Sequence, residues 1–338
     1  MVFDHERNRL MRTMAVKWIA GICLACSMAD AALAQSSASA FVPGTGSELT
    51  QVGDDFEDPD WEYIPNNPKS SSDIDKRQNT PIGKSKNGRW FEGVKRGHPD
   101  VVQRVDTPPG GLPGSQGALL LQSLYTGIPN RPSHTMHQED FIANLQYRLG
   151  GAIDVTQAPS VTTRVFLPPI DQWEHRSGPH FAFRVALETD VPKFNPKRFF
   201  VSKKEDEEEE GVYWPGLFIV LESKHETGQE HDYAYFRVRA DRSGGDAKGP
   251  QITSTGWWTL GMSFSPDGLV HYYARPGVED LTQADYITSQ LPYGYQCKRF
   301  RSFFYNVVNG DDGVNWTTPW VVDDPKVFLS RGGRVAFR

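Results

Sequence analysis

Residues 255–275 read TGWWTLGMSFSPDGLVHYYAR, and this stretch predicts a β-hairpin. Large apolar side chains recur at every second position from 258 to 264, and an apolar face continues from 270 to 274. Between the two arms, residues 266–268 (PDG) supply a turn, because proline presets φ and glycine accepts positive φ. A period of two places one face of both arms in a core. The opposite face then carries Trp257, His271, Tyr273 and Arg275.

The same kind of pattern continues through most of the chain. The 338 residues include 31 glycines and 24 prolines, and short alternating runs broken by turn residues outnumber helical patterns after residue 35. These features favour an all-β class. Further strands are expected at 118–124, 161–167, 180–188, 216–222, 232–240, 299–307 and 319–329. Strands at such intervals predict a two-sheet antiparallel jelly-roll sandwich.

The N-terminus has the composition of an export signal. A basic segment at 7–17 precedes an apolar stretch at 18–29, and Ala32-Leu33-Ala34 offers a cleavage site. The apolar stretch is too short to span a bilayer. We therefore expect residues 1–34 to be a cleaved signal peptide, with no stable membrane insertion afterwards and a secreted or periplasmic location. Small polar residues predict a flexible leader at 35–50, which leaves a single jelly-roll domain over 51–338.

Cysteine content and charge limit the cross-links and partners that the chain can have. Cys23 and Cys26 fall within the predicted signal, so the mature chain would keep only Cys297 and form no intrachain disulfide. A formal net charge of −6 gives no reason to expect nucleic acid as a partner. The acidic run at 205–210 predicts a solvated loop, since contiguous carboxylates cannot all turn towards one cation.

Three segments resemble the concanavalin A-like lectin/glucanase superfamily, which includes laminin G-like domains. Asp55-Phe56-Glu57 is similar to the first strand of such domains, and residues 256–273 resemble their tryptophan-containing hairpin. Residues 321–327 look like the closing strand that returns beside the first. The likeness covers roughly residues 52–330. It implies a fold more than an activity, because this fold hosts lectins, glycan-binding modules, glycoside hydrolases and polysaccharide lyases.

The resemblance also implies a structural calcium ion. In such folds an ion often joins the first and last strands, and Glu57 and Asp324 occupy similar positions here. Carboxylate oxygens suit calcium. Asp311-Asp312-Gly313 is an alternative calcium site or simply an acidic turn.

Arginine and aromatic residues share the outward face of further predicted strands. If those strands lie in the same sheet as the hairpin, they form one surface with it. Aromatic rings suit the apolar faces of sugars, and guanidinium groups suit carboxylate or sulfate. The expected ligand-binding residues are Arg184, Tyr233, Tyr235, Arg237, Arg239, Trp257, His271 and Tyr273. The alternative is that these are ordinary outward side chains on half-exposed strands.

Motifs for catalysis are incomplete. The nearest approach to a glucanase acid triad is Asp58-Pro59-Asp60-Trp61-Glu62, which starts with Asp and contains proline. A polysaccharide lyase needs a cation beside the uronate and a Tyr or His as base. Residues of those types are Arg237, Arg239, His180, His271, Tyr233 and Tyr273, but the alginate-lyase sequence patterns are absent. His134 and His137 fall in a stretch with Glu139 and Asp140 that we expect to be a polar loop, with a transition-metal site as the alternative.

Three functional hypotheses follow from these observations. The first is a secreted carbohydrate-binding protein that recognises an anionic polysaccharide. The second is an enzyme of the same fold, either a polysaccharide lyase, which is favoured, or a glycoside hydrolase. The third is a non-catalytic surface or matrix protein with protein partners.

Overall fold

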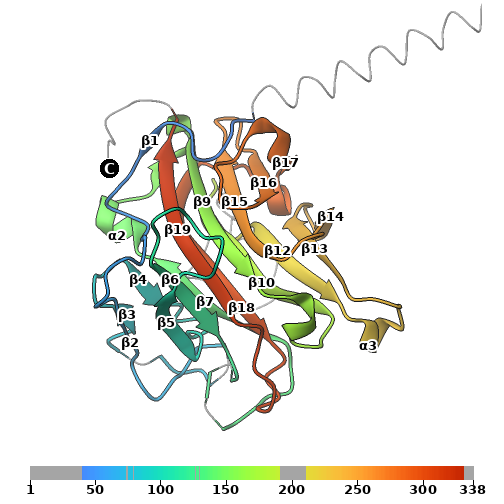
Figure 1. Ribbon diagram of the computed structural model, residues 1–338. Helices are drawn as coiled ribbons and strands as arrows, with labels where there is room; N and C mark the ends of the chain where they lie inside the picture. The colour runs from blue at the N-terminus through green and yellow to red at the C-terminus, as the bar shows by residue number, and fades with distance from the viewer. Residues whose placement is uncertain are drawn as a thin grey trace, which may run out of the picture. The chain divides into compact units, whose positions relative to one another are not determined.

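The computed structural model describes residues 40–190 and 211–330, apart from residues 74, 79, 126 and 129. Within these ranges almost all regular structure is β (Figure 1), and the strands form an eight-stranded and an eleven-stranded antiparallel sheet. The eight-stranded sheet has the order β17 (Tyr286–Gln290), β16 (Val270–Pro276), β15 (Gly256–Phe264), β9 (Pro159–Leu167), β19 (Trp320–Leu329), β6 (Gly117–Gln122) and β5 (Val101–Asp106), and β1 (Ser47–Glu48) pairs with β19.

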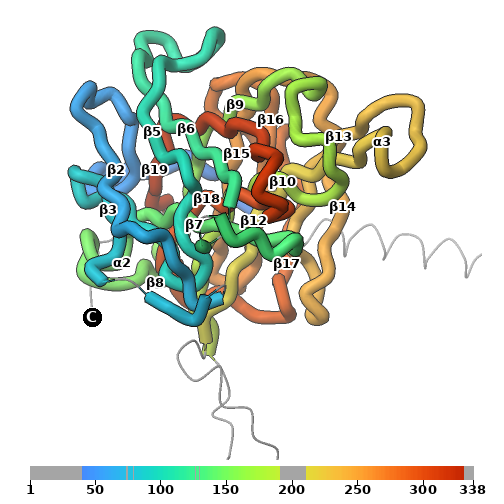
Figure 2. The backbone as a smooth tube through the Cα atoms, turned by 90° about the horizontal axis from the view of Figure 1, so that it is seen from below, coloured from blue at the N-terminus to red at the C-terminus, as the bar shows by residue number. Residues whose placement is uncertain are grey.

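The eleven-stranded sheet has the order β14 (Asp246–Gln251), β13 (Tyr233–Arg239), β12 (Gly216–Glu222), β10 (Gly178–Glu188), β18 (Arg299–Asn309), β7 (His137–Ala143), β4 (Trp90–Glu92), β3 (Lys84–Ser85) and β2 (Tyr63–Ile64). Two further strands pair with it, β11 (Val212–Tyr213) on β10 and β8 (Ile153–Asp154) on β18. Its two ends lie on opposite sides of the view in Figure 2, with β2 and β3 at one side and β13 and β14 at the other.

Helical structure in the described ranges is short. It consists of α2 (Leu145–Leu149), α3 (Lys224–Thr227) and 3₁₀ turns at Val155–Gln157, Ile170–Gln172, Gln283–Asp285 and Pro292–Gly294. None of the described helices has the length and apolarity needed to cross a bilayer. The predicted fold class, an all-β two-sheet antiparallel jelly-roll sandwich, is confirmed.

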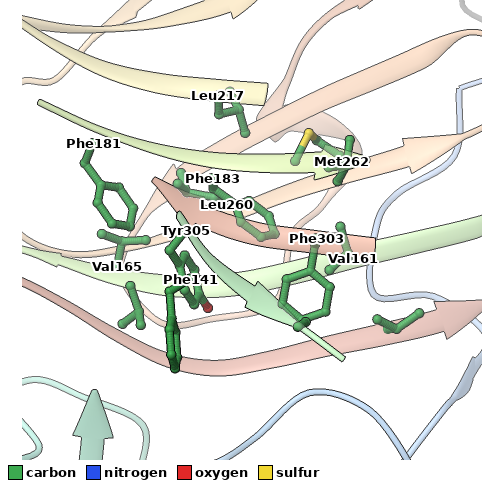
Figure 3. Packing of buried hydrophobic residues seen from close by; sticks show 14 of the residues in the cluster. Phe141, Val161, Val165, Phe181, Phe183, Leu217, Leu260, Met262, Phe303 and Tyr305 are labelled. Carbon is green, nitrogen blue, oxygen red and sulfur yellow. The ribbon is translucent and has the colours of Figure 1, made fainter. Parts of the chain in front are cut away.

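The core lies between the inner faces of the two sheets (Figure 3). Phe141, Phe183 and Tyr305 of the eleven-stranded sheet and Leu260 and Met262 of the other sheet are all fully buried. In a close-packed core, each large side chain contributes several kilocalories per mole to the free energy of unfolding, because its removal leaves a cavity. The side chains predicted for the shared core all belong to it: Phe181, Phe183, Phe236, Val238, Trp258, Leu260 and Tyr272.

The predicted hairpin forms β15 and β16 with the expected register. Met262 lies opposite Tyr272, and both point into the core. Gly268 has a φ of 85° and donates its N–H to the carbonyl of Ser265 at 2.8 Å, which closes the turn. An L-residue with a Cβ would be strained at that φ. The alternation in residues 255–275 therefore identified both the hairpin and its buried face.

The predicted first strand at residues 55–57 is wrong. Phe56 has a φ of 53° and is buried, so the chain turns there instead of extending. The first strand of the domain is instead β1, which pairs with the last strand, β19, so that Ser47 lies opposite Leu329. A leader that is flexible up to residue 50 is likewise contradicted, since the Leu49 N–H donates to the Val327 carbonyl at 2.8 Å. The predicted signal (1–34), the rest of the leader (35–39) and the acidic run (205–210) lie outside the described residues.

The stretch around His137 is a strand and not the expected polar loop. It forms β7, which pairs with β18 in the middle of the eleven-stranded sheet. The apolar alternation that marks a strand is broken there because Glu139 occupies a core-facing position. The sequence pattern therefore did not predict this strand, nor did it predict β5, β14 and β17.

Candidate functional site

The residues predicted to bind ligand do not form one surface. Trp257, His271 and Tyr273 belong to β15 and β16 of the eight-stranded sheet. The remaining members are on β10 and β13 of the eleven-stranded sheet: Arg184, Tyr233, Tyr235, Arg237 and Arg239. Because the sheets pack by their inner faces, the two sets lie on opposite outer faces of the sandwich. Strand alternation identifies a face of a strand but not the sheet that the strand joins.

The outer face of the eight-stranded sheet is covered at these positions. Trp257 is 5% exposed, packs against Phe166 and donates its Nε1–H to the carbonyl of Pro108 at 3.3 Å. His271 is fully buried and its two ring nitrogens contact the hydroxyls of Ser265 and Ser289. These side chains already have protein partners, so their role in ligand binding stays a prediction and they are not part of the surface described below.

Tyr273 on the same face is buried too, with its ring edge-on to Tyr286 at 5.5 Å. Burial raises the pKa of Tyr273 to about 12 and lowers the pKa of His271 to about 4. His180, the other histidine considered as a base, is buried in the eleven-stranded sheet, and burial lowers its pKa to about 3. A general base must reach the proton that it removes, so a role of these buried residues in lyase chemistry stays a prediction.

The outer face of the eleven-stranded sheet carries three arginines around one phenylalanine. We call Arg184, Arg237 and Arg239 the arginine cluster. Their guanidinium carbons lie 5.4, 5.6 and 5.6 Å from the ring centroid of Phe218, within the range of cation–π attraction. Phe218 lies opposite Arg237 in the register of β12 and β13.

The arginine cluster has fewer anionic partners than cations among the described residues. Asp246 pairs with both Arg237 and Arg239, each at 3.0 Å. Arg184 donates instead to neutral acceptors, Gln138 Oε1 at 3.1 Å and the carbonyl of Trp214 at 2.8 Å. Arg184 is 4% exposed, and its Nε has no hydrogen-bond partner within the described part of the chain. The accessible cations of this face are therefore Arg237 and Arg239, whose side chains are 26% and 21% exposed, while the buried Arg184 adds positive charge beneath them.

Burial lowers the pKa of Arg184 to about 10, and the neighbouring Arg96 adds to this effect. The side chain therefore keeps its charge at neutral pH. Arg96 donates to Gln138 Oε1 at 2.9 Å and lies 3.5 Å from Asp140, so Gln138 links the two guanidinium groups. Asn306 donates to the same Asp140 at 2.6 Å. A polar row thus crosses β10, β18 and β7 beside the cluster.

A pocket of about 750 Å³ opens on the same face. Phe91 and Ile142, which are opposite each other in β4 and β7, are part of its lining. Ile142 lies opposite Phe304, and Phe304 lies opposite Arg184, so the lining continues into the arginine cluster. Trp214 joins the two regions most directly, because it lines the pocket while its carbonyl accepts from Arg184.

Further residues around the pocket come from α2 and β18. Tyr147 on α2 is 85% exposed, and Arg301 donates its Nε–H to Gln146 at 2.7 Å. The sequence reasoning did not select Trp214, Tyr147 or Phe91. They lie in short elements with no repeated alternation, and only the pairing of distant strands brings them together.

Tyr233 and Tyr235 lie next to the arginine cluster but are already engaged. The ammonium group of Lys248 lies 4.4 Å from each ring centroid. Tyr235 also donates its hydroxyl to Glu222 at 3.1 Å and is largely buried. These tyrosines lie on β13, next to the edge strand of the eleven-stranded sheet. Arg184, Arg237 and the pocket make up the central part of its outer face.

The predicted calcium ligands do not fit a calcium ion. Asp324 is paired through one oxygen with Arg164 at 2.7 Å and through the other with Lys326 at 2.9 Å. Glu57 accepts the Gln116 N–H with both oxygens, at 3.1 and 3.0 Å. Both carboxylates therefore face protein donors. Across the described ranges no group of three or more His, Cys, Asp or Glu side chains is placed to hold a metal ion.

The alternative at residues 311–313 is an acidic turn. Asp312 accepts the backbone N–H groups of Val314 and Asn315, both at 2.8 Å. The side chain of Asp311 accepts the N–H of Ser133 at 2.7 Å. These hydrogen bonds hold a loop in shape.

Comparisons with known proteins concern the fold. No protein-family model and no curated protein matches this sequence. The binding domain of Paraclostridial Mosquitocidal Protein 1 is similar with 10% identity and a TM-score of 0.35, over 75% of this chain and 48% of that one. The chain thus spans about half the length of that structure.

Two further solved structures are similar at the same level. The exoplasmic/lumenal domain of VIP36, in a form bound to Ca²⁺ and Man3GlcNAc, has 10% identity and a TM-score of 0.34 over 73% of this chain and 86% of that one. An alginate lyase from Pseudomonas aeruginosa has 9% identity and a TM-score of 0.37 over 69% of this chain and 87% of that one. The resemblance is one of fold alone and assigns neither a ligand nor a reaction to this chain.

Proposed function

We propose that this protein binds an anionic polysaccharide on the outer face of the eleven-stranded sheet. The observation that carries the proposal is the arginine cluster, in which Arg184, Arg237 and Arg239 have Asp246 as their one paired carboxylate among the described residues. The partly exposed guanidinium groups of Arg237 and Arg239 can bind carboxylate or sulfate through a planar pair of donors, and the weakly screened charge of the buried Arg184 adds to the attraction. Phe218 and Phe304 hold Arg184 from either side, which reduces the entropy lost when a ligand binds.

The adjoining pocket supplies the second part of a glycan site. Its volume of about 750 Å³ falls within the usual range for small ligands, roughly 300–1,000 Å³. The aromatic side chains of Trp214, Tyr147 and Phe91 offer apolar faces on which a sugar ring can stack. A chain that spans the pocket and the arginine cluster would present rings to the first and acidic groups to the second.

The export signal predicted at residues 1–34 would direct the protein to a secreted or periplasmic location. Polysaccharides are accessible there, which supports the proposal. A net charge of −6 favours a local positive site over general attraction to polyanions such as nucleic acid. Specificity would then come from the shape of the site as well as from charge.

Affinity electrophoresis in gels that contain single glycans tests the proposal. The panel pairs alginate, pectate, glucuronan and glycosaminoglycans with neutral glucans and mannans. We expect retardation by one or more anionic glycans and a loss of retardation as salt is added. Equal retardation by neutral glycans would contradict an anionic ligand, and no retardation by any glycan would favour the protein-interaction hypothesis. Growth of near-ultraviolet absorbance from unsaturated uronates would instead identify a lyase.

A further inference from the structure

A second charged cluster is buried on the core side of β7. Lys69 is 3% exposed and Glu139 is fully buried, and the two side chains form an ion pair. The Nζ of Lys69 also lies 3.0 Å from Asp100 Oδ1. Glu139 points away from the outer face that carries Gln138 and Asp140, so this cluster is separate from the candidate glycan site. A buried amine and a buried carboxyl group therefore meet a second carboxyl group, that of Asp100, whose side chain is 18% exposed.

The carboxyl group of Asp100 is held in a fixed orientation. Its Oδ2 accepts the backbone N–H groups of Leu124 at 2.6 Å and Tyr125 at 2.9 Å, while Oδ1 faces the amine of Lys69. Two N–H donors on one carboxyl oxygen stabilise negative charge that develops there when a nucleophile adds to the carbon. The Lys69 amine, which also donates to the Tyr125 carbonyl, thus lies 3.0 Å from one oxygen of a carboxyl group whose other oxygen is held by two N–H donors.

Glu139 is suited to proton transfer in this cluster. It contacts the amine with Oε1 and accepts the hydroxyl of Ser123 with Oε2. Burial raises the pKa of Glu139 to about 8, so this carboxyl can take up and give back a proton near neutral pH.

We propose that Lys69 and Asp100 condense into an intramolecular isopeptide bond, with Glu139 as the acid–base group. The Lys69 ammonium passes one proton to Glu139, and the free Nζ attacks Cγ of Asp100. The Cγ–Oδ1 bond then breaks, and that oxygen leaves as water with the proton returned by Glu139 and a second proton from the nitrogen. One ammonium and one carboxylate become one neutral amide and one water, and no oxidant or reductant is needed.

The bond would join residues 31 positions apart in the chain and tie the loop that contains Lys69 to the segment before β5. Among the described residues the free, buried Cys297 is the sole cysteine, so no disulfide performs this task there. An amide cross-link limits the unfolded chain in the same way as a disulfide but does not respond to reducing agents.

Mass spectrometry of the purified protein tests the inference. We expect an intact mass one water molecule below the mass of the processed sequence. We also expect a tryptic product in which the Lys69 and Asp100 peptides are joined, because trypsin does not cleave after an amidated lysine. Lys69→Arg keeps the positive charge without the nucleophile and should show its full sequence mass. Glu139→Gln keeps the shape without the acid–base group and should leave the peptides separate, with circular dichroism used to confirm that both variants fold.

Asp100→Asn gives an independent readout, since the same attack would release ammonia and yield the cross-linked mass of the wild type. Separate peptides in the wild type would overturn the proposal, and so would an amide that joins Lys69 to Glu139 instead. The result does not depend on glycan binding, so the two proposals fail separately.

Discussion

Trp257 and Trp258 are neighbours in the chain and lie on opposite faces of β15. Trp258 packs edge-on against Phe236 with ring centroids 5.1 Å apart in the core between the sheets. Trp257 packs against Phe166 at 5.5 Å in a small cluster outside that core. The pleat of the strand separates the two rings, and their surroundings predict different contributions to stability.

Replacing Trp258 with alanine should lower the free energy of unfolding by about 3–5 kcal/mol, because the core cannot collapse around the cavity. Trp257→Ala should cost less, since the loop that contains Pro108 can settle onto the sheet. Urea unfolding followed by circular dichroism measures both values. A larger loss for Trp257→Ala would mean that the buried face of β15 has been misassigned.

Asp324 should act as an ion-pair partner and not as a metal ligand. Asp324→Asn leaves the nearly buried Arg164 without its main counter-charge and should cost about 3 kcal/mol. Asparagine is the suitable replacement because Asp324 has a φ of 50°, which asparagine tolerates better than alanine does. Lys326→Ala serves as the control, since its ammonium is partly exposed and the loss should be below about 1 kcal/mol. Similar losses for the two variants would count against the buried pair.

Acid should destabilise the protein in part through His271. Burial lowers its pKa in the folded state to about 4, from an ordinary value of 6.5 in the unfolded chain. Between those values the unfolded chain binds more protons, so the contribution of His271 to stability falls as the pH falls through this window. His271→Gln does not titrate, and the stability difference between wild type and variant should therefore shrink from pH 6.5 to pH 4.

Denaturant titrations at a series of pH values measure that difference. His231→Gln provides the matched histidine-to-glutamine control at an exposed position, where the side chain is 83% exposed. A gap between wild type and His271→Gln that stays constant over the whole range would show that the histidine keeps its ordinary pKa.

Tyr147 should contribute to glycan binding and not to folding. Its 85% exposure means that Tyr147→Ala should change stability by no more than about 0.5 kcal/mol. Loss of an aromatic anchor should weaken binding of charged and neutral oligosaccharides alike, by about tenfold. Trp316→Ala removes another exposed aromatic ring that does not line the pocket and should leave binding unchanged. Isothermal titration calorimetry distinguishes the two variants, and equal effects would exclude the pocket as the site.

The sequence predicted the fold class and the main strands because local alternation survives in them, as in β15 with Trp258 and Leu260 in the core. It missed β7 because Glu139 occupies a core position, where an acid breaks the apolar pattern. It could not predict what covers a strand. Trp257 and His271 are on the outward face as expected but lie beneath residues distant in the chain.

The candidate site was likewise only partly predictable from the sequence. Arg184, Arg237 and Arg239 were selected from alternation, and the structure brings them together around Phe218. The adjoining pocket could not be found in this way, because its lining comes from β4, β7, α2 and the segment before β12. Pairing between β4, β7 and β18 creates it, and such pairing depends on contacts far apart in the chain.

The most direct test of glycan recognition is the ratio of dissociation constants for a uronate oligosaccharide and its carboxyl-reduced, neutral counterpart. Arg237 and Arg275 make a matched pair, because their side chains are 26% and 27% exposed and lie on opposite outer faces. The wild type should prefer the uronate. Arg237→Gln should reduce that preference about tenfold, as expected for one charged hydrogen bond, while Arg275→Gln should keep it. A wild type that binds both oligosaccharides equally, or an equal loss in the two variants, would contradict recognition of an anionic glycan by the arginine cluster.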